Sequence, residues 1–131
     1  MILDTSFVED VASGEEDAVQ AADVLRQEGI PERLSVITLY ELYWGVSYVD
    51  TPQHERDRID GVLESKETYD VTPEIARKAG RITGRLSSDG RPINDPGDEL
   101  IGATGVVHDE PVLTRNVDHF ERIPGLEVET Y

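Results

Sequence analysis

The chain has 131 residues and no cysteine, so it has the length of one compact domain (1–131) and cannot form disulfides or thiolate metal sites. No apolar run approaches the roughly 20 residues of a membrane helix, and the N-terminal MILDTS lacks the basic region of a signal peptide, so we expect a cytoplasmic protein with no membrane partner. The 28 acidic residues outnumber the 12 basic residues and are interleaved with apolar ones, which indicates a folded, halophilic protein of net charge −16.

Apolar residues recur at helical and strand periods in alternation along the chain. In chain order we expect a strand at 1–3, a helical turn at 6–11, a helix at 15–28, a strand at 34–37, helices at 38–49 and 51–65, a strand at 69–71, a helix at 72–87, a loop at 88–97, a helix at 98–107, a strand at 111–114, a turn at 117–122 and a strand at 126–130. Strands that alternate with helices predict an α/β fold, in which a parallel β-sheet is sandwiched by α-helices in three layers.

Three helix starts carry capping signals. Ser13 is expected to cap the second helical segment, because serine is a preferred N-cap residue. Thr38 and Glu41 have the spacing of a capping box at the start of the next helix. Thr72 followed by Pro73 is a strong helix start, because proline is favoured at the first helical position.

Four acidic side chains lie where a strand gives way to a helix, namely Asp4, Glu41, Asp98 and Asp118. In a parallel sheet, ligands bind outside the carboxyl ends of the strands, so we expect these acids to meet along one edge. Carboxylates gathered in this way can hold a hard divalent cation against a phosphodiester. The sequence therefore predicts an acidic metal site.

Each acid also has a local explanation. Asp4 is a preferred N-cap residue, Glu41 can serve the capping box, and Asp98 can favour the dipole of its helix from the first turn. Asp118, taken alone, is explained as a solvated turn residue. Capping does not require all four acids at one edge of a sheet, however, and the joint interpretation as a cation site accounts for the whole set.

Four segments span nearly the whole chain: MILDTSF, TLYELYWGV, GRPINDPGDELIGAT and PVLTRNVDHFERIPGLEVETY. In their residues, order and spacing they resemble the PIN-domain ribonucleases of the VapC toxin type. The resemblance implies a PIN-like fold and a magnesium-dependent endoribonuclease, the toxic component of a type II toxin–antitoxin system, which cleaves RNA phosphodiesters by metal-activated water. It further implies that a cognate antitoxin binds the chain and that the chain forms a homodimer.

The resemblance also implies roles for individual residues. Asp4 and Asp98 would bind the metal, Mg²⁺ or Mn²⁺, and Glu41 would complete the catalytic site. The fourth acidic position of many such nucleases is Asn116 in this chain. Two alternatives follow for that position: Asn116 orients a metal-bound water, or the nearby Asp118 supplies the missing charge.

Hydroxyl and basic side chains beside these acids are candidate substrate contacts. They are Thr5, Ser6, Thr114, Arg115 and Arg85. The hydroxyls could hold the carboxylates or a phosphate oxygen, or serve as local caps, and the arginines can instead pair with the abundant surface acids.

Two further neighbours of the acids are expected to lie outside the site. His119 could approach the site, but it is predicted to be a surface histidine, because none of the three histidines has the paired spacing of metal ligands. Asp95 is predicted to lie in the loop before Asp98, or behind the metal ligands.

The aromatic residues Tyr40, Tyr43, Trp44 and Tyr48 recur at helical spacing, which indicates packing in the core or at a protein interface. Two other functions are alternatives to a nuclease. A phosphoacceptor domain of the receiver type needs an adjacent acidic pair after the first strand, and Asp4 stands alone there. A PIN-like module that binds RNA or protein without nuclease activity is the alternative that stays open.

Overall fold

Five short strands form one parallel sheet in the computed structural model, which describes residues 1–131. The strands are β1 (Ile2–Leu3), β2 (Arg33–Ser35), β3 (Glu67–Tyr69), β4 (Val112–Leu113) and β5 (Val128–Glu129). Their order across the sheet is β3-β2-β1-β4-β5, and every neighbouring pair is parallel. The predicted α/β fold with a parallel sheet is therefore confirmed.

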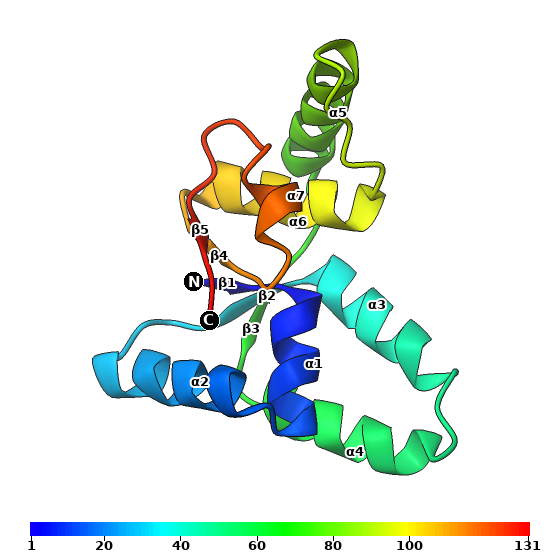
Figure 1. Cartoon of the computed structure of the whole chain (residues 1–131), viewed down its shortest axis with the longest axis vertical. Coiled ribbons are helices and arrows are strands. Elements are labelled where there is room, and N and C mark those ends of the chain that lie inside the picture. Colours follow the sequence, from blue (N-terminus) through cyan, green and yellow to red (C-terminus); the bar gives the residue numbers. More distant parts are fainter.

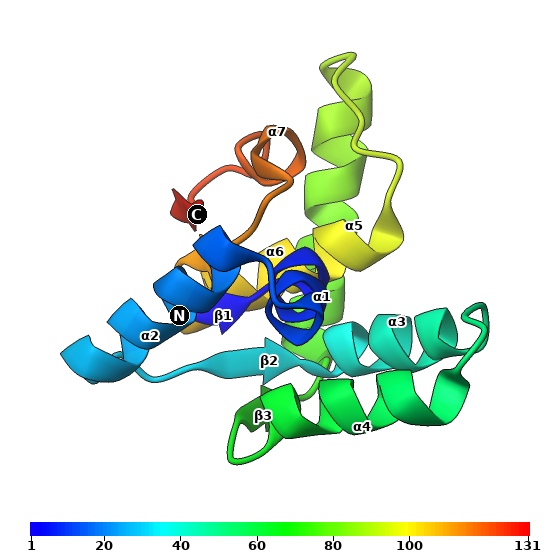
Figure 2. The ribbon, with the colours of Figure 1, turned by 60° about the horizontal axis from the view of Figure 1, so that its bottom comes forward.

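Helices cover both faces of this sheet. They are α1 (Thr5–Ser13), α2 (Glu16–Glu28), α3 (Val36–Val46), α4 (Pro52–Leu63), α5 (Pro73–Ser88), α6 (Pro96–His108) and α7 (Val117–Phe120). In Figure 1 the strands run through the middle of the molecule, with α1, α2 and α4 below them and α5, α6 and α7 above. Helices α3 and α4 lie side by side as a pair (Figure 2). None of the helices is both long and apolar enough to cross a bilayer.

Each face of the sheet has its own hydrophobic core, because successive side chains of a strand point to opposite faces. Leu3, Leu34 and Leu113 pack in the core formed with α1 to α4. Ile2 and Val112 pack in the core formed with α5 to α7. All five side chains are at most 3% exposed, and fully burying such a side chain contributes about 1.5–3 kcal/mol. The alternation along the strands thus determines which helices lie on which face.

Helix α3 begins earlier than the sequence predicts. The Ser35 hydroxyl accepts a hydrogen bond from the backbone N–H of Ile37 at 3.2 Å, so Ser35 caps the helix. The strand predicted at 34–37 is therefore too long, and the predicted capping box of Thr38 and Glu41 does not form. The β-branched residues after Ser35 favour strands, but the cap and the burial of one face of α3 outweigh that propensity.

Helix α1 is longer than the predicted turn at 6–11 and includes Ser13 as its last residue. Gly14 ends it in the left-handed conformation with φ of 81°, which glycine adopts without a steric cost. The predicted cap of α2 by Ser13 is therefore wrong. Glu15 takes the cap position, and the Ser13 hydroxyl donates to the Asp10 carbonyl oxygen at 3.1 Å.

Helix α5 begins where the sequence predicts it. The Thr72 hydroxyl accepts a hydrogen bond from the backbone N–H of Ile75 at 3.2 Å, and Pro73 occupies the first turn. The preceding strand is shifted, however, because β3 pairs with β2 over Glu67–Tyr69 rather than over the predicted 69–71. The pairing partner, rather than local propensity, determines where this short strand ends.

Helix α6 lies close to the segments around β4 because its glycines leave room. A Cβ atom on Gly105 would lie 2.9 Å from the carbonyl oxygen of Glu110 and 2.6 Å from Leu126 Cδ1. A Cβ atom on Gly102 would clash with the side chain of Ile123. This close packing holds the first turn of α6 at the carboxyl edge of the sheet.

Replacing Gly105 and Gly84 by alanine should change stability in opposite directions. Gly105→Ala forces the backbone of Glu110 to move, and we expect it to lower the free energy of unfolding by about 1–3 kcal/mol. Gly84 is exposed within α5 with open space around its missing Cβ, so Gly84→Ala should raise that free energy by about 0.5–1 kcal/mol. Urea unfolding of both variants in the same salt measures the changes. Equal effects would contradict the close packing of α6.

Candidate metal centre

Asp4, Glu41 and Asp98 come from three different elements that meet at the carboxyl edge of the sheet. Asp4 directly follows β1 and precedes α1, and Asp98 lies in the first turn of α6. Glu41 belongs to α3, the helix that follows β2. The charges of Asp4 and Asp98 both raise the pKa of Glu41, so the three carboxylates lie close enough to repel one another. The expectation that these acids meet at one edge is met in the geometry.

Asp4 is 3% exposed, and its two carboxylate oxygens have different surroundings. Oδ2 accepts hydrogen bonds from the Ser6 hydroxyl at 2.9 Å and from the Thr114 hydroxyl at 2.7 Å. Oδ1 is buried and has no hydrogen-bond partner. Burial raises the pKa of Asp4 against the opposing effect of the two hydroxyl hydrogen bonds. A buried carboxylate oxygen without a partner is unfavourable, and a bound cation would satisfy it.

Glu41 accepts a hydrogen bond from the Thr5 hydroxyl. Its pKa is raised to about 7, chiefly by burial, while the Thr5 hydrogen bond opposes the rise and the neighbouring acids add to it. Gly97 faces this carboxylate, and a Cβ atom at that position would overlap with Glu41 Oε1. Glycine at position 97 therefore leaves the space that the Glu41 side chain occupies.

Asp98 is 8% exposed and is held by two side chains of the segment after β4. Its Oδ2 lies 3.0 Å from Asn116 Nδ2, which donates to it, and 2.6 Å from His119 Nδ1. Burial raises the pKa of Asp98 to about 6; the hydrogen bond with His119 opposes the rise, and the charges of Asp4 and Asp95 add to it. Asp98 therefore combines a buried carboxylate with an amide donor and an imidazole.

Three desolvated carboxylates held together fit a divalent cation. Their pKa values are all raised by burial, and those of Glu41 and Asp98 are raised further by the charges of neighbouring acids. A divalent cation offsets that repulsion and gives Asp4 Oδ1 the partner that it lacks. Carboxylate oxygens are the donors that Mg²⁺ and Mn²⁺ prefer. Asp4 and Asp98 are thus the residues that could hold the ion, with Glu41 beside it.

Of the alternatives that the sequence left open for the three hydroxyls, the geometry favours the one in which they hold the carboxylates. Thr5 donates to Glu41, and both Ser6 and Thr114 donate to Asp4. These hydrogen bonds orient the carboxylates, so the geometry gives the hydroxyls a positioning role.

Asp118 does not join the acids in the way that the sequence suggested. Its side chain is 78% exposed, and its carboxylate accepts a hydrogen bond from Arg122 at 2.6 Å. The next residue, His119, makes the contact with Asp98 instead. Residues 118 and 119 point in different directions because consecutive side chains on a helix are separated by about 100°. The interpretation of Asp118 as the fourth acid therefore needs correction.

The two predicted arginine contacts are also engaged elsewhere. The guanidinium of Arg115 donates to both carboxylate oxygens of Asp10 at 2.7 Å. Arg85 is 74% exposed on α5 and lies 3.7 Å from the carboxylate of Asp89. Neither arginine contacts the three acids.

Sequence reasoning missed two residues of the centre, Asp95 and His119. Asp95 caps α6 by accepting from the backbone N–H groups of Gly97 at 3.0 Å and Asp98 at 3.2 Å. Donor atoms of Asp95, Asp98 and His119 all lie within 4.8 Å of one another. The spacing of Asp95 to Asp98 is that of an N-cap and the third helical residue, a signal that could have placed both acids in one turn.

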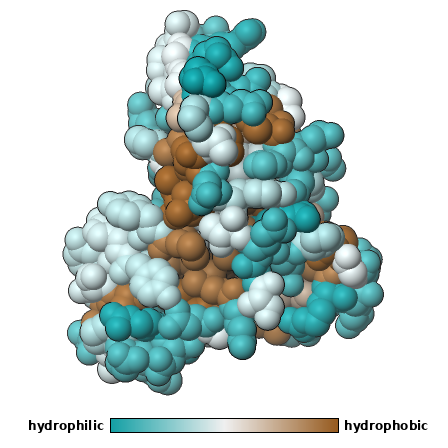
Figure 3. Space-filling model, turned by 180° about the vertical axis from the view of Figure 1, so that it is seen from behind, coloured by the Kyte–Doolittle hydropathy of each residue, from teal (hydrophilic) through white to brown (hydrophobic).

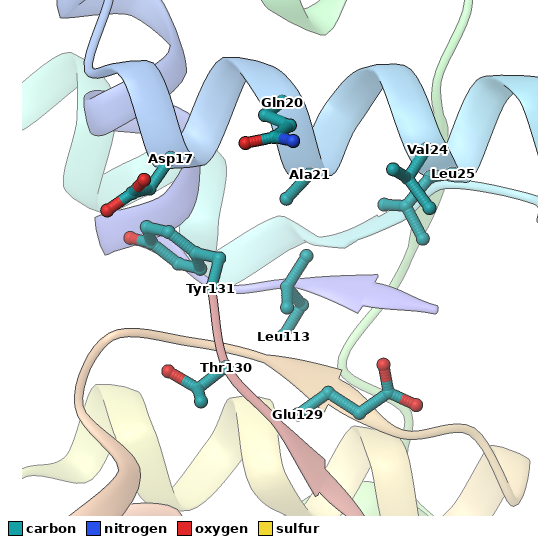
Figure 4. Close-up of a pocket in the computed structure, with 9 residues that line it drawn as sticks. All are labelled: Asp17, Gln20, Ala21, Val24, Leu25, Leu113, Glu129, Thr130 and Tyr131. Carbon is teal, nitrogen blue, oxygen red and sulfur yellow. The ribbon is translucent and has the colours of Figure 1, made fainter.

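A cavity of about 350 Å³ lies apart from the acids, between α2 and the C-terminal end of the chain (Figure 4). Its lining includes Val24 and Leu25 of α2, together with Leu113 and Tyr131. None of the three acids lines it. The cavity therefore does not belong to the acidic centre.

Known proteins match the chain over most of its length. A family model described as the PIN domain matches residues 1–126. Ribonuclease VapC19 of Mycobacterium tuberculosis is 32% identical over 126 residues, which cover 96% of each chain. The tRNA(fMet)-specific endonuclease VapC of Salmonella typhimurium is 32% identical over 102 residues, which cover 75% of this chain and 74% of that protein. The crystal structure of DNA-bound VapBC from Salmonella typhimurium has a similar fold, with a TM-score of 0.87 and 26% identity over 98% of this chain and 96% of that chain.

The affinity of the centre for a divalent cation should rise steeply with pH. Protons compete with the cation for carboxylates whose pKa values are about 6 for Asp98 and about 7 for Glu41, so affinity should increase through that interval and level off above it. Titration calorimetry with Mn²⁺ at a series of pH values measures this dependence. Glu41→Gln should remove the rise in affinity near pH 7, because that rise comes from deprotonation of Glu41. An affinity independent of pH would contradict the raised pKa values.

The same pKa values predict the opposite trend for the metal-free protein. A raised pKa means that the folded chain keeps protons that the unfolded chain has released. The contribution of Asp98 and Glu41 to the free energy of unfolding therefore falls as pH rises from the ordinary values of 3.8 and 4.5 to about 6 and about 7. Thermal unfolding of the metal-free protein over the same pH series measures this fall. Glu41→Gln is the control, because the variant lacks the contribution of Glu41 and should lose less stability near pH 7.

Proposed function

The chain belongs to the PIN domain family, and from this premise we propose that it is a metal-dependent endoribonuclease, the toxin of a type II toxin–antitoxin pair. The observation that carries the proposal is that Asp4, Glu41 and Asp98 lie near one another at the carboxyl edge of the sheet and that one buried oxygen of Asp4 has no hydrogen-bond partner. The names of its relatives support the reaction class, since both are called ribonucleases or endonucleases. We expect the protein to act on RNA in the cytoplasm.

Asp4 and Asp98 would hold the cation, which we propose to be Mg²⁺ or Mn²⁺. When bound, such an ion stabilises negative charge on a phosphoryl group and makes a neighbouring water more acidic. The hydroxyls of Ser6 and Thr114 fix Asp4 Oδ2, and the unpartnered Oδ1 would be available to the ion. Asn116 holds Asp98 through its amide and so supports a ligand without adding charge.

Glu41 is the best-placed proton acceptor of the centre. Burial and the neighbouring acids raise its pKa to about 7 in the metal-free protein, and a nearby cation would favour the ionised form that accepts a proton. The hydrogen bond from Thr5 and the space beside Gly97 fix its orientation. We propose that Glu41 takes the proton of the attacking water, and that hydrolysis leaves a 5′-phosphate and a 3′-hydroxyl on the RNA.

Apolar surface on the molecule supports a protein partner, which we propose to be a cognate antitoxin and a second copy of the chain. Helix α3 exposes Tyr40, Trp44 and, just beyond its end, Tyr48, which are 58% to 74% exposed. Apolar side chains also reach the surface in the middle of the face shown in Figure 3. Aromatic residues are enriched in protein interfaces because they bury a large area with few rotatable bonds.

The unpaired basic side chains are concentrated beside α5. Of the 12 basic residues, seven make ion pairs. Four of the remaining five lie between residues 77 and 91, and they are Arg77, Lys78, Arg81 and Arg91. In a chain of net charge −16 this is the region where a phosphate backbone meets the least repulsion. We propose that RNA contacts α5, with Arg81 and Arg85 among the contacts.

Cleavage of cellular RNA by the isolated protein tests the proposed function. In concentrated potassium chloride with Mg²⁺ or Mn²⁺ we expect discrete fragments, which disappear with a chelator. Asp98→Asn should reduce cleavage at least about a hundredfold, because it removes a charged ligand of the ion. Folded, metal-loaded protein that binds RNA without cutting it would instead support the non-cleaving module.

A matched pair of double variants tests the RNA contact. Arg81→Gln with Arg85→Gln removes two cations from α5, and Arg56→Gln with Arg26→Gln removes two cations from α4 and α2. Each pair contains one side chain in an exposed ion pair and one without an ion pair, so net charge changes equally.

Both pairs are measured in the cleavage-deficient Asp98→Asn protein, as RNA affinity against salt concentration. In a plot of the logarithm of RNA affinity against the logarithm of salt concentration, the α5 variant should have a slope about 1.4 shallower than that of the parent protein. Each phosphate contact on a single strand contributes about 0.7 to this slope. The control should keep the original slope. Identical slopes for the two pairs would exclude α5 as the contact.

A further inference from the structure

His119 lies next to Asp98 together with Asn116, whereas Asp118 does not. Its Nδ1 lies 2.6 Å from Asp98 Oδ2, while its side chain is 30% exposed. Helix α7 begins after Asn116, so residue 119 falls one turn later and on the same side. The exposed, arginine-paired Asp118 lies on another side of this turn. The imidazole and the Asn116 amide are therefore the side chains of this segment that lie against Asp98.

The three close contacts among Asn116, Asp98 and His119 cannot all be hydrogen bonds. Asn116 Nδ2 lies 3.0 Å from Asp98 Oδ2 and 2.8 Å from His119 Nδ1, which itself lies 2.6 Å from the same Oδ2. If Nδ1 accepts from the amide, its lone pair faces a carboxylate oxygen. If Nδ1 instead carries a proton for Asp98, it faces the N–H groups of the amide. With the carboxylate ionised, an unprotonated Nδ1 places two hydrogen-bond acceptors against each other, and a protonated Nδ1 places two donors against each other.

We propose that His119 is a further ligand of the divalent cation, bound through Nδ1, and that this nitrogen donor makes the centre prefer Mn²⁺ over Mg²⁺. The inference rests on the metal centre proposed above and adds to it the identity of one ligand and a metal preference. A cation shared by Nδ1 and Asp98 Oδ2 removes the conflict of contacts, because both lone pairs then point to a positive charge while the amide still donates to the carboxylate.

The distances suit a shared ion after a small adjustment. Ligand atoms at about 2.1 Å from a cation in octahedral geometry are about 3 Å apart when adjacent. Nδ1 and Oδ2 are 2.6 Å apart, and donor atoms of Asp95, Asp98 and His119 all lie within 4.8 Å of one another. Asp4 contributes a separate indication of an ion, since its buried Oδ1 has no partner within the protein. The imidazole therefore needs to move by only a few tenths of an ångström.

The chemical identity of the donor determines the expected selectivity. Mg²⁺ is a hard cation that binds oxygen almost exclusively and keeps several waters. Imidazole nitrogen is a softer donor, and affinity for nitrogen sites rises from Mn²⁺ along the first transition series. A centre of carboxylates alone would discriminate weakly between Mg²⁺ and Mn²⁺. Adding Nδ1 of His119 strengthens Mn²⁺ binding with little benefit to Mg²⁺.

Pulsed electron paramagnetic resonance of the Mn²⁺-loaded full chain tests the ligation directly. A histidine nitrogen bound to Mn²⁺ modulates the electron spin echo, and we expect this modulation in the wild type. Labelling histidine with the heavy nitrogen isotope should change its frequencies, a result that needs no variant. His119→Gln should abolish the modulation, whereas His54→Gln, an exposed residue of α4, should leave it intact.

Titration calorimetry with Mn²⁺ and with Mg²⁺ tests the preference. His119→Gln should lower the ratio of Mn²⁺ to Mg²⁺ affinity by about tenfold, a loss typical of altered groups around a metal, and His54→Gln should leave it unchanged. Circular dichroism checks the fold, and His119→Asn serves if the glutamine variant is unfolded.

The outcomes separate the ligand from the function. Mn²⁺ that binds without nitrogen modulation would overturn the role of His119 while the metal-dependent cleavage of RNA stands. Unchanged selectivity in the variant would overturn the preference. Absence of both Mn²⁺ binding and RNA cleavage would overturn the metal centre and the proposed nuclease together.

Discussion

The burial of three neighbouring carboxylates at one edge of the sheet is unfavourable unless positive charge joins them. Asp4 is nearly inaccessible, and only one of its oxygens is satisfied by hydroxyls. Glu41 and Asp98 have pKa values raised to about 7 and about 6 by the same desolvation. The folded protein therefore maintains a site that is costly on its own and that a divalent cation would stabilise, a common relation between stability and function.

The surrounding fold holds these acids in place against their repulsion. The central strands β1 and β4 bring Asp4 and Thr114 side by side. Helix α6 packs closely against the segments around β4, which places Asp98 at the same edge of the sheet. Asp98 lies in the first turn of α6, where the helix dipole partly offsets its charge. Gly97 leaves room for Glu41. Core packing far from the acids thus supports the geometry at their carboxylates.

Charge is distributed unevenly over the rest of the molecule, and this distribution bears on how an acidic chain approaches a polyanion. Most arginines are paired with acids, including Arg115, whose guanidinium is bound by Asp10. The side chains of α5 are the main exception. Concentrated salt screens the repulsion at long range, so short-range contacts from α5 and from a bound cation can dominate. The negative net charge is therefore compatible with RNA as a partner.

The residues alone were sufficient to predict the parallel α/β fold and the start of α5, because periodicity and capping are properties of neighbouring residues. They also predicted that four acids meet at one edge of the sheet; the structure brings Asp4, Glu41 and Asp98 near one another and leaves Asp118 exposed. They did not predict that α3 starts at Val36 or that His119 rather than Asp118 lies against Asp98. They left open whether the Thr5, Ser6 and Thr114 hydroxyls hold the carboxylates, contact a phosphate or cap helices, a choice that the structure decides in favour of the carboxylates. Those contacts join segments up to 110 residues apart. Such pairings depend on how helices pack onto the sheet, and a local pattern holds no information about which distant side chain will lie opposite.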